Sequence, residues 1–164
     1  MYKRQDQDGS TDVELVALEE LARGSDFVCV NAALTPDTRH LLDTRFFSLL
    51  KPGAFLINAA RGPIVDEAAL VEALRSGVVA GAALDVFERE PLSTDSPLLE
   101  FEEVLLTPHA VAWTDELYRG NGQGATRAVL AIADGERPDT VVNPEVFENP
   151  VLLRRLDALT RRTR

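Results

Sequence analysis

Four ionisable side chains fall at or just after the ends of successive apolar runs in this sequence. Arg61, Asp85, Glu90 and His109 each follow a run that is typical of a buried strand. In a parallel sheet the carboxyl ends of the strands share one edge, and ligands bind in the crevice beyond that edge. The sequence therefore predicts one site to which all four residues contribute.

The types of these residues indicate the chemistry. A guanidinium is permanently charged and presents two parallel donors, so Arg61 fits a substrate carboxylate better than a lysine would. When a hydride reaches a carbonyl, charge develops on the oxygen, and an imidazolium at His109 can supply the proton. Glu90, hydrogen-bonded to His109, would favour the charged ring and fix its orientation. This set suits the reduction of a 2-oxo acid.

Alternating strands and helices must position these side chains. The hydrophobic pattern predicts a parallel sheet with crossover helices, an α/β fold. We expect Asp43 and Asp66 to cap two of the helices. The predicted strands cover residues 27–32, 54–58, 80–86 and 104–107, and the predicted helices cover residues 13–23, 44–50, 67–76, 115–134 and 151–159.

Composition and charge exclude several classes of protein. The 164 residues, 45% of them hydrophobic, suffice for one ordinary core. A net charge of -10 would repel a phosphate backbone, so no nucleic-acid partner is expected. No apolar run approaches the roughly 18 residues that span a bilayer, so no membrane partner is expected either. The single cysteine, Cys29, has no disulfide partner and is predicted to pack in the core, which suits a reducing cytoplasm.

Three motifs in the sequence carry a resemblance to a known family. They read NAARGPIVDE at residues 58–67, AALDVFEREP at residues 82–91 and TPH at residues 107–109. In this order they are similar to the signatures of the D-isomer-specific 2-hydroxyacid dehydrogenases. The resemblance runs from about residue 13 to residue 143, and residues 109–113 (HAVAW) resemble the C-terminal binding protein branch. It implies a doubly wound, Rossmann-like parallel sheet.

The resemblance also implies a role for each matched position. Arg61 corresponds to the arginine that binds the substrate carboxylate, His109 to the acid/base histidine and Glu90 to its carboxylate partner. Trp113 corresponds to a residue that contacts the substrate side chain, with plain burial as the alternative. Asp85 corresponds to an aspartate near the nicotinamide carboxamide. The implied cofactor is NAD, and its cleft would be lined by Asn31, Ala32, Ala33, Ala59, Ala60 and Ala112 together with Arg61, Asp85 and His109.

Some parts of the family pattern are absent. The sequence has no Gly-x-Gly-x-x-Gly turn between a strand and a helix, and no acidic strand end to hold the adenosine ribose. NADP is therefore not excluded, and we expect a sheet truncated at its N-terminus. The predicted organisation is a disordered or non-native start (1–11), the C-terminal portion of an NAD-binding domain (12–135) and a segment returning towards an absent substrate domain (136–164). The resemblance also suggests a homodimeric parent.

Three functions remain open from the sequence. The chain is a fragment of a hydride-transferring dehydrogenase, a non-catalytic NAD(H)-responsive binding protein like C-terminal binding protein, or an inactive fragment. The presence of Arg61, Glu90 and His109 together favours the first. His40 is interpreted as a surface histidine, and Asp66 and Glu67 as residues that begin a helix.

Overall fold

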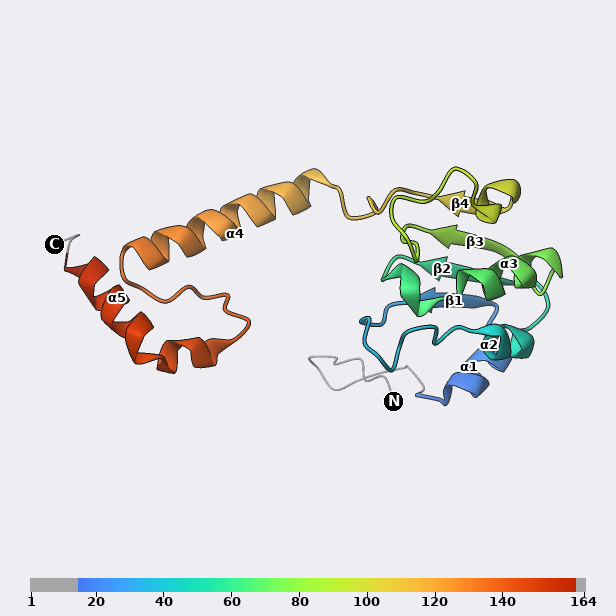
Figure 1. Ribbon diagram of the computed structural model, residues 1–164, viewed down its shortest axis with the longest axis horizontal. Helices are drawn as coiled ribbons and strands as arrows, with labels where there is room; N and C mark the ends of the chain where they lie inside the picture. The colour runs from blue at the N-terminus through green and yellow to red at the C-terminus, as the bar shows by residue number, and fades with distance from the viewer. Residues whose placement is uncertain (1–14, 162–164) are drawn as a thin grey trace. The chain divides into compact units, whose positions relative to one another are not determined.

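The computed structural model describes residues 15–161, in which strands and helices alternate before a helical C-terminal part (Figure 1). The predicted disordered start lies outside the described residues. The α-helices are α1 (Leu18–Gly24), α2 (Thr44–Leu49), α3 (Glu67–Arg75), α4 (Asp115–Ala133) and α5 (Pro150–Thr160). The strands are β1 (Phe27–Val30), β2 (Ala54–Asn58), β3 (Val79–Leu84) and β4 (Val104–Leu106), and short 3-10 turns are η1 (Gly62–Ile64), η2 (Pro97–Glu100) and η3 (Pro144–Glu148).

The four strands form one parallel sheet in the order β1-β2-β3-β4. Their arrowheads point the same way in Figure 1, so all four carboxyl ends lie along one edge. The register pairs Val30 with Asn58 and Asn58 with Leu84, which places the loops that follow these strands next to each other. The predicted α/β, Rossmann-like parallel sheet is confirmed.

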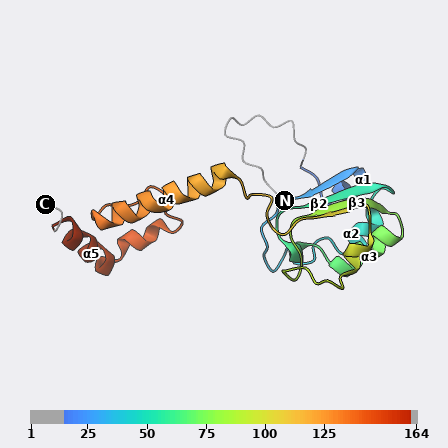
Figure 2. The ribbon, with the colours of Figure 1, turned by 90° about the horizontal axis from the view of Figure 1, so that it is seen from above.

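The hydrophobic core lies between the sheet and helices α2 and α3, which lie on the same side of it (Figure 2). Along β1, Val28 and Val30 are buried whereas Phe27 is exposed, as the two-residue period of a strand requires. Leu56 of β2 and Leu70 of α3 are among the most deeply buried side chains. Burial of this apolar surface drives the packing of the helices on the sheet.

The opposite face of the sheet exposes apolar side chains. Phe27 and Phe55 stack at a ring-centroid distance of 5.5 Å, and Leu105 is also exposed. Cys29 lies on this face, so the prediction that it packs in the core is wrong. An apolar run shows that a strand is present, but only the alternation within it decides which side chains face the helices.

The predicted capping residues are confirmed. Asp43 accepts a hydrogen bond from Phe46 N at the start of α2, and Asp66 accepts one from Ala69 N at the start of α3. The strand predicted over residues 54–58 matches β2, whereas the other three predicted strands extend one or two residues too far at their carboxyl ends. The first helix begins at Leu18, so the expectation that it covers residues 15–17 is wrong. Residues 13 and 14 lie outside the described part of the chain.

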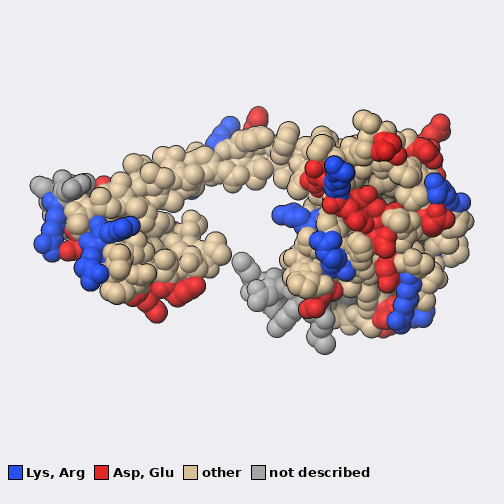
Figure 3. All heavy atoms as spheres, in the orientation of Figure 1, with Lys and Arg blue, Asp and Glu red and all other residues tan. Residues whose placement is uncertain are grey.

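The chain divides into two compact units, Met1–Val111 and Ala112–Arg164. In the second unit, α5 packs against α4 and η3, and Phe147 and Leu156 are buried. Arg137 lies 4.9 Å from the centroid of the Phe147 ring. Within residues 15–161, no helix has both the length and the apolar character needed to cross a membrane. Acidic and basic side chains intermingle on the face of the first unit seen in Figure 3.

Candidate active site

The turn after β2 is held by a buried asparagine. Asn58, 1% exposed, accepts a hydrogen bond from Ala60 N (3.0 Å) and donates one to Arg61 O (3.2 Å). The turn therefore presents Ala59 and Arg61 at the surface of the sheet edge. The Arg61 guanidinium donates to Ala60 O at 2.6 Å, which leaves most of its five N–H donors available for a ligand.

Gly62 brings this turn against the loop that follows β3. A Cβ added at Gly62 would lie 1.9 Å from both Phe87 C and Phe87 O, and 2.6 Å from Glu88 N. Only glycine permits this approach, because any side chain would occupy the space of the Phe87–Glu88 peptide. The contact fixes the Arg61 turn against the Glu90 loop, which we define as residues 86–91.

Asp85 lies at the carboxyl end of β3 and is 4% exposed. Its carboxylate accepts hydrogen bonds from Thr107 Oγ1 (2.6 Å), Ala110 N (2.8 Å) and Val111 N (3.0 Å). Burial raises the pKa of Asp85, but these hydrogen bonds, together with the nearby His109, outweigh it and hold the pKa below its usual value. Asp85 therefore ties β3 to the His109 loop, residues 107–111.

His109 occupies the left-handed region of backbone conformation, with a φ of 54°. A non-glycine residue rarely adopts this conformation, and such strain persists where the surrounding structure holds it, commonly at functional sites. Here the N–H groups on both sides are fixed, since His109 N donates to Thr107 O (3.1 Å) and Ala110 N donates to Asp85. The strained backbone aims the ring at the Glu90 loop.

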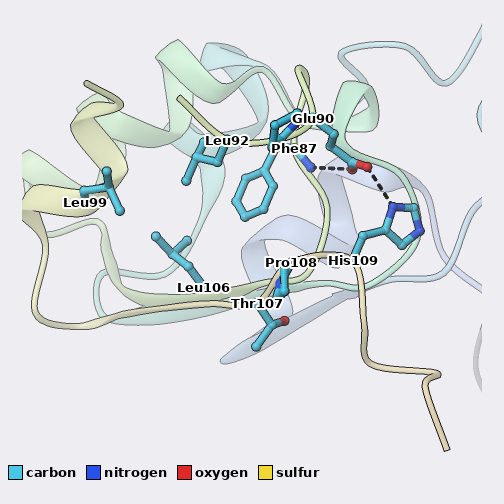
Figure 4. A pocket seen from close by; sticks show the side chains of 9 residues that line it. Phe87, Glu90, Leu92, Leu99, Leu106, Thr107, Pro108 and His109 are labelled. Carbon is cyan, nitrogen blue, oxygen red and sulfur yellow. Dashed lines mark hydrogen bonds and ion pairs between the residues drawn. The ribbon is translucent and has the colours of Figure 1, made fainter. Parts of the chain in front are cut away.

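The His109 ring and Glu90 form a hydrogen-bonded pair. His109 Nδ1 donates to Glu90 Oε2 at 2.8 Å, and Phe87 N donates to Glu90 Oε1 at 3.0 Å (Figure 4). The hydrogen bond from His109 is the main cause that lowers the pKa of Glu90, and the charge of Arg61 contributes in the same direction. The fold thus brings Arg61, Glu90 and His109 together, as predicted, with Asp85 behind His109.

An apolar pocket of about 320 Å³ adjoins this pair. Leu92, Leu99 and Leu106 gather on one side of the Phe87 ring, and the His109 imidazole lies on the other (Figure 4). Its lining is Phe87, Glu90, Pro91, Leu92, Leu99, Leu106, Thr107, Pro108 and His109. Among residues 15–161, no group of three or more histidine, cysteine, aspartate or glutamate side chains is placed to hold a metal ion.

The predicted cofactor-lining positions divide between the two units. Asn31, Ala32 and Ala33 follow β1, and Ala59 and Ala60 follow the neighbouring strand β2, all at the sheet edge that carries the site. Their small, partly or fully exposed side chains leave the backbone open to a ligand.

Two further predicted positions, Ala112 and Trp113, belong to the second unit, where Trp113 is 64% exposed. Plain burial, which was the alternative to a substrate contact for Trp113, is therefore not observed.

Sequence reasoning missed three residues that build the site. Asn58 shapes the Arg61 turn, Gly62 makes the contact with the Glu90 loop, and Thr107 anchors Asp85. A polar residue that ends an apolar strand, as Asn58 does, is a signal that could have been used, because a buried amide needs hydrogen-bond partners. The partners of Gly62 and Thr107 lie more than 20 residues away in the sequence.

A family model described as "D-isomer specific 2-hydroxyacid dehydrogenase, NAD binding domain" matches residues 1–111. The chain belongs to this family. Glyoxylate reductase of Thermofilum pendens is 43% identical over 137 residues, which cover 84% of this chain and 40% of that protein. The chain thus spans about 40% of the length of the curated relatives that it matches.

Solved structures from the family share the fold. A D-isomer-specific 2-hydroxyacid dehydrogenase from Xanthobacter autotrophicus Py2, in complex with NADPH and MES, is 44% identical with a TM-score of 0.65. The match covers 77% of this chain and 50% of that one. D-lactate dehydrogenase with NAD+ from Lactobacillus jensenii is 30% identical with a TM-score of 0.72, covering 77% of this chain and 42% of that one.

Proposed function

We propose that this chain is the NAD-binding, proton-transferring part of an enzyme that moves a hydride between NAD(H) and a 2-hydroxy or 2-oxo acid. The observation that carries the proposal is the 2.8 Å hydrogen bond from a strained histidine, His109, to Glu90, a carboxylate on which the charge of Arg61 also acts. A carboxylate binder and a proton donor at one sheet edge are the two groups that a 2-oxo acid requires.

Each residue has a separate task in the proposed reaction. NADH, when bound, would supply the hydride that the carbonyl carbon receives. Arg61 holds the substrate carboxylate through parallel charge-assisted hydrogen bonds. His109 donates through Nδ1 to Glu90, so its Nε2 is the ring atom that delivers the proton to the carbonyl oxygen. In the reverse direction the same Nε2 accepts the proton from the hydroxyl group.

The loops after β1 and β2 are the proposed cofactor-binding segments. Thr38, which is buried, orders the first of them, since its hydroxyl donates to Ala33 O (2.7 Å) and accepts from Thr35 N (2.7 Å). Small residues at both strand ends would permit close approach of a nicotinamide, and Asp85, at the end of the neighbouring strand β3, is the residue that the resemblance places near the nicotinamide carboxamide. Because Asp85 also fixes the His109 loop, we assign it a positioning role in addition.

The substrate class is a small 2-oxo acid. Relatives named glyoxylate reductase and D-lactate dehydrogenase support this class, and neighbours with NAD+ or NADPH leave both cofactors open. We keep the homodimeric parent and the cytoplasmic location as proposals, the latter supported by an exposed free cysteine that suits a reducing compartment.

A binding protein without catalysis and an inactive fragment were the alternatives. The named relatives do not favour the first. For the isolated 164 residues we propose weak NADH binding or none, because the family's Gly-rich phosphate-binding turn is absent from this sequence. Calorimetry that measures micromolar NADH affinity for the isolated chain would contradict this part.

The test uses a protein that joins this chain to the portion present in its full-length relatives. NADH and NADPH oxidation is followed with glyoxylate and pyruvate, and with acetone as the matched ketone without a carboxylate. We expect turnover of the 2-oxo acids and none of acetone. Equal turnover of acetone would remove the carboxylate-binding role, and no turnover of any 2-oxo acid would reject the dehydrogenase function.

A further inference from the structure

Two glutamates outside the proposed reaction bind each other's backbone. Glu67 N donates to Glu88 Oε1 at 2.9 Å, and Glu88 N donates to Glu67 Oε1. We call this reciprocal pair the carboxylate clasp. It joins the first residue of α3 to the Glu90 loop, two residues before Glu90 itself.

The clasp brings two carboxylates close together, which is costly unless something compensates. Burial raises the pKa of Glu67, and the charge of Glu88 adds to that rise, although the hydrogen bond from Glu88 N opposes both. Two acids sharing a partly buried place benefit from a positive neighbour. Among the described residues, the structure places one basic side chain within ion-pair distance of Glu88, and this side chain carries a positive charge only when it is protonated.

That neighbour is His40, whose Nε2 lies 3.3 Å from Glu88 Oε1 and whose Nδ1 lies 3.9 Å from Asp66 Oδ2. Its Nε2 is buried and makes no regular hydrogen bond. Like His109, it has a left-handed backbone, with a φ of 51°. His40 N donates to Pro63 O at 2.8 Å, so the strained residue is pinned to the segment between Arg61 and α3.

The clasp and the Gly62 contact act on the same part of the Glu90 loop. Gly62 packs on the peptide between Phe87 and Glu88, and the clasp binds the N–H group of that peptide. Phe87 N on its other side donates to Glu90 Oε1. One peptide therefore connects the clasp to the carboxylate that holds the His109 ring.

We propose that His40 and the Glu67–Glu88 clasp are positioning residues, which hold the Glu90 loop so that Glu90 keeps its hydrogen bond to His109. The catalytic consequence rests on the proposed function, whereas the structural consequence does not. If packing alone held the Glu90 loop, or if His40 were only the surface residue predicted from the sequence, no link between the clasp and His109 would be required.

The chain has only two histidines, which makes the link measurable by NMR. The readout is the exchange rate of the His109 Nδ1 proton with water in the 164-residue chain, since that proton is protected by its hydrogen bond to Glu90. Glu88→Ala removes the acceptor for Glu67 N, and Glu88→Gln keeps an acceptor oxygen in its place. Glu72→Ala, on the exposed side of α3 and paired with Arg75, is the control.

We expect Glu88→Ala to increase the exchange rate about tenfold, as for the loss of one hydrogen bond. Glu88→Gln and Glu72→Ala should change it less than about twofold. In His40→Asn, asparagine tolerates the left-handed backbone and His109 is the single imidazole left in the chain. This variant should increase the exchange rate of the His109 Nδ1 proton severalfold, and it provides the test even if Glu88→Ala does not fold. An unchanged His109 signal in His40→Asn would reject the proposal.

The longer protein separates this proposal from the proposed function. Glu88→Ala should lower kcat while leaving the KM for NADH unchanged, and Glu88→Gln should restore most of the loss. An inactive longer protein in which the NMR link persists would reject the dehydrogenase function but not the clasp. An active one in which Glu88→Ala changes neither kcat nor the His109 signal would reject the clasp but not the function.

Discussion

The two histidines share a backbone conformation but differ in the groups that their rings contact. His40 and His109 are the two non-glycine residues with positive φ in the described part of the chain, and each faces a glutamate of the Glu90 loop. His109 makes a direct 2.8 Å hydrogen bond through Nδ1 and borders a pocket. His40 lies between two acids, and its Nε2 is buried.

The acids of the two pairs also have different tasks. Glu90 accepts a hydrogen bond from Phe87 N with one oxygen and from the histidine with the other, so the second oxygen serves only to orient the ring. Glu88 uses Oε1 for Glu67 N, and His40 approaches that same oxygen. A strained histidine beside a carboxylate is therefore not by itself a proton donor. An open second nitrogen near a carboxylate binder distinguishes His109.

The largest expected difference between the two histidines appears when each is replaced in the longer protein. His109→Gln should lower kcat by about 10²–10⁴, the usual contribution of a positioned acid/base. His40→Asn should lower it by less than about tenfold. Steady-state kinetics with NADH and glyoxylate measures both, and equal losses from the two substitutions would abolish the distinction.

The next effect concerns Arg61, the proposed carboxylate binder, whose charge acts on the glutamate partner of His109. Arg61→Ala should raise the KM for the 2-oxo acid about 10²–10³-fold, because two charge-assisted hydrogen bonds are lost, and should leave the KM for NADH near its original value. Arg75→Ala, a surface arginine paired with Glu72, is the control. An unchanged oxo-acid KM in Arg61→Ala would separate Arg61 from the site.

A smaller effect is expected where the Arg61 turn meets the Glu90 loop that both histidines face. Gly62→Ala should lower the free energy of unfolding by about 1–3 kcal/mol, because the added Cβ overlaps the Phe87–Glu88 peptide. Gly24→Ala, where a Cβ would meet nothing within 4 Å, is the matched control. Urea denaturation that gives the two variants equal stability would refute the close contact.

The smallest effect concerns Asp85, which holds the His109 loop and has no equivalent at His40. Its lowered pKa means that the carboxylate stabilises the fold above about pH 4, and that this contribution is lost as the pH falls through the folded-state pKa. Asp85→Asn should therefore reduce the free energy of unfolding by about 1–2 kcal/mol at pH 7 and by less near pH 3.

Urea titrations at the two pH values measure this difference, with Asp37→Asn at an exposed position as the control. A difference that grows towards low pH would have the wrong sign for a carboxylate with a lowered pKa.

The sequence was sufficient for what depends on local pattern. Asp43 and Asp66 were predicted as caps from their places before helical runs, and the four strands were located by their apolar runs, although three of the carboxyl ends were placed one or two residues too far along. The meeting of Glu90 with His109 followed from the shared edge of parallel strands. These features need only short-range rules and one rule of topology.

What could not be predicted depends on the relative depth and approach of distant segments. Cys29 lies in an apolar run, yet it faces away from the helices because alternation, not composition, sets the side. His40 was interpreted as a surface residue and Glu67 as a helix-start residue, since nothing local connects either of them to Glu88. The steric requirement for glycine at position 62 cannot be predicted either, because it depends on the position of the loop that follows β3.

The most direct test of the account is a crystal structure of the longer protein with NAD+ and oxamate, a non-reacting analogue of a 2-oxo acid. We predict that Arg61 binds the oxamate carboxylate and that His109 Nε2 lies within about 3 Å of its carbonyl oxygen, with Nδ1 still bonded to Glu90. Oxamate bound away from Arg61, or with its carbonyl oxygen turned from His109, would contradict the proposed site.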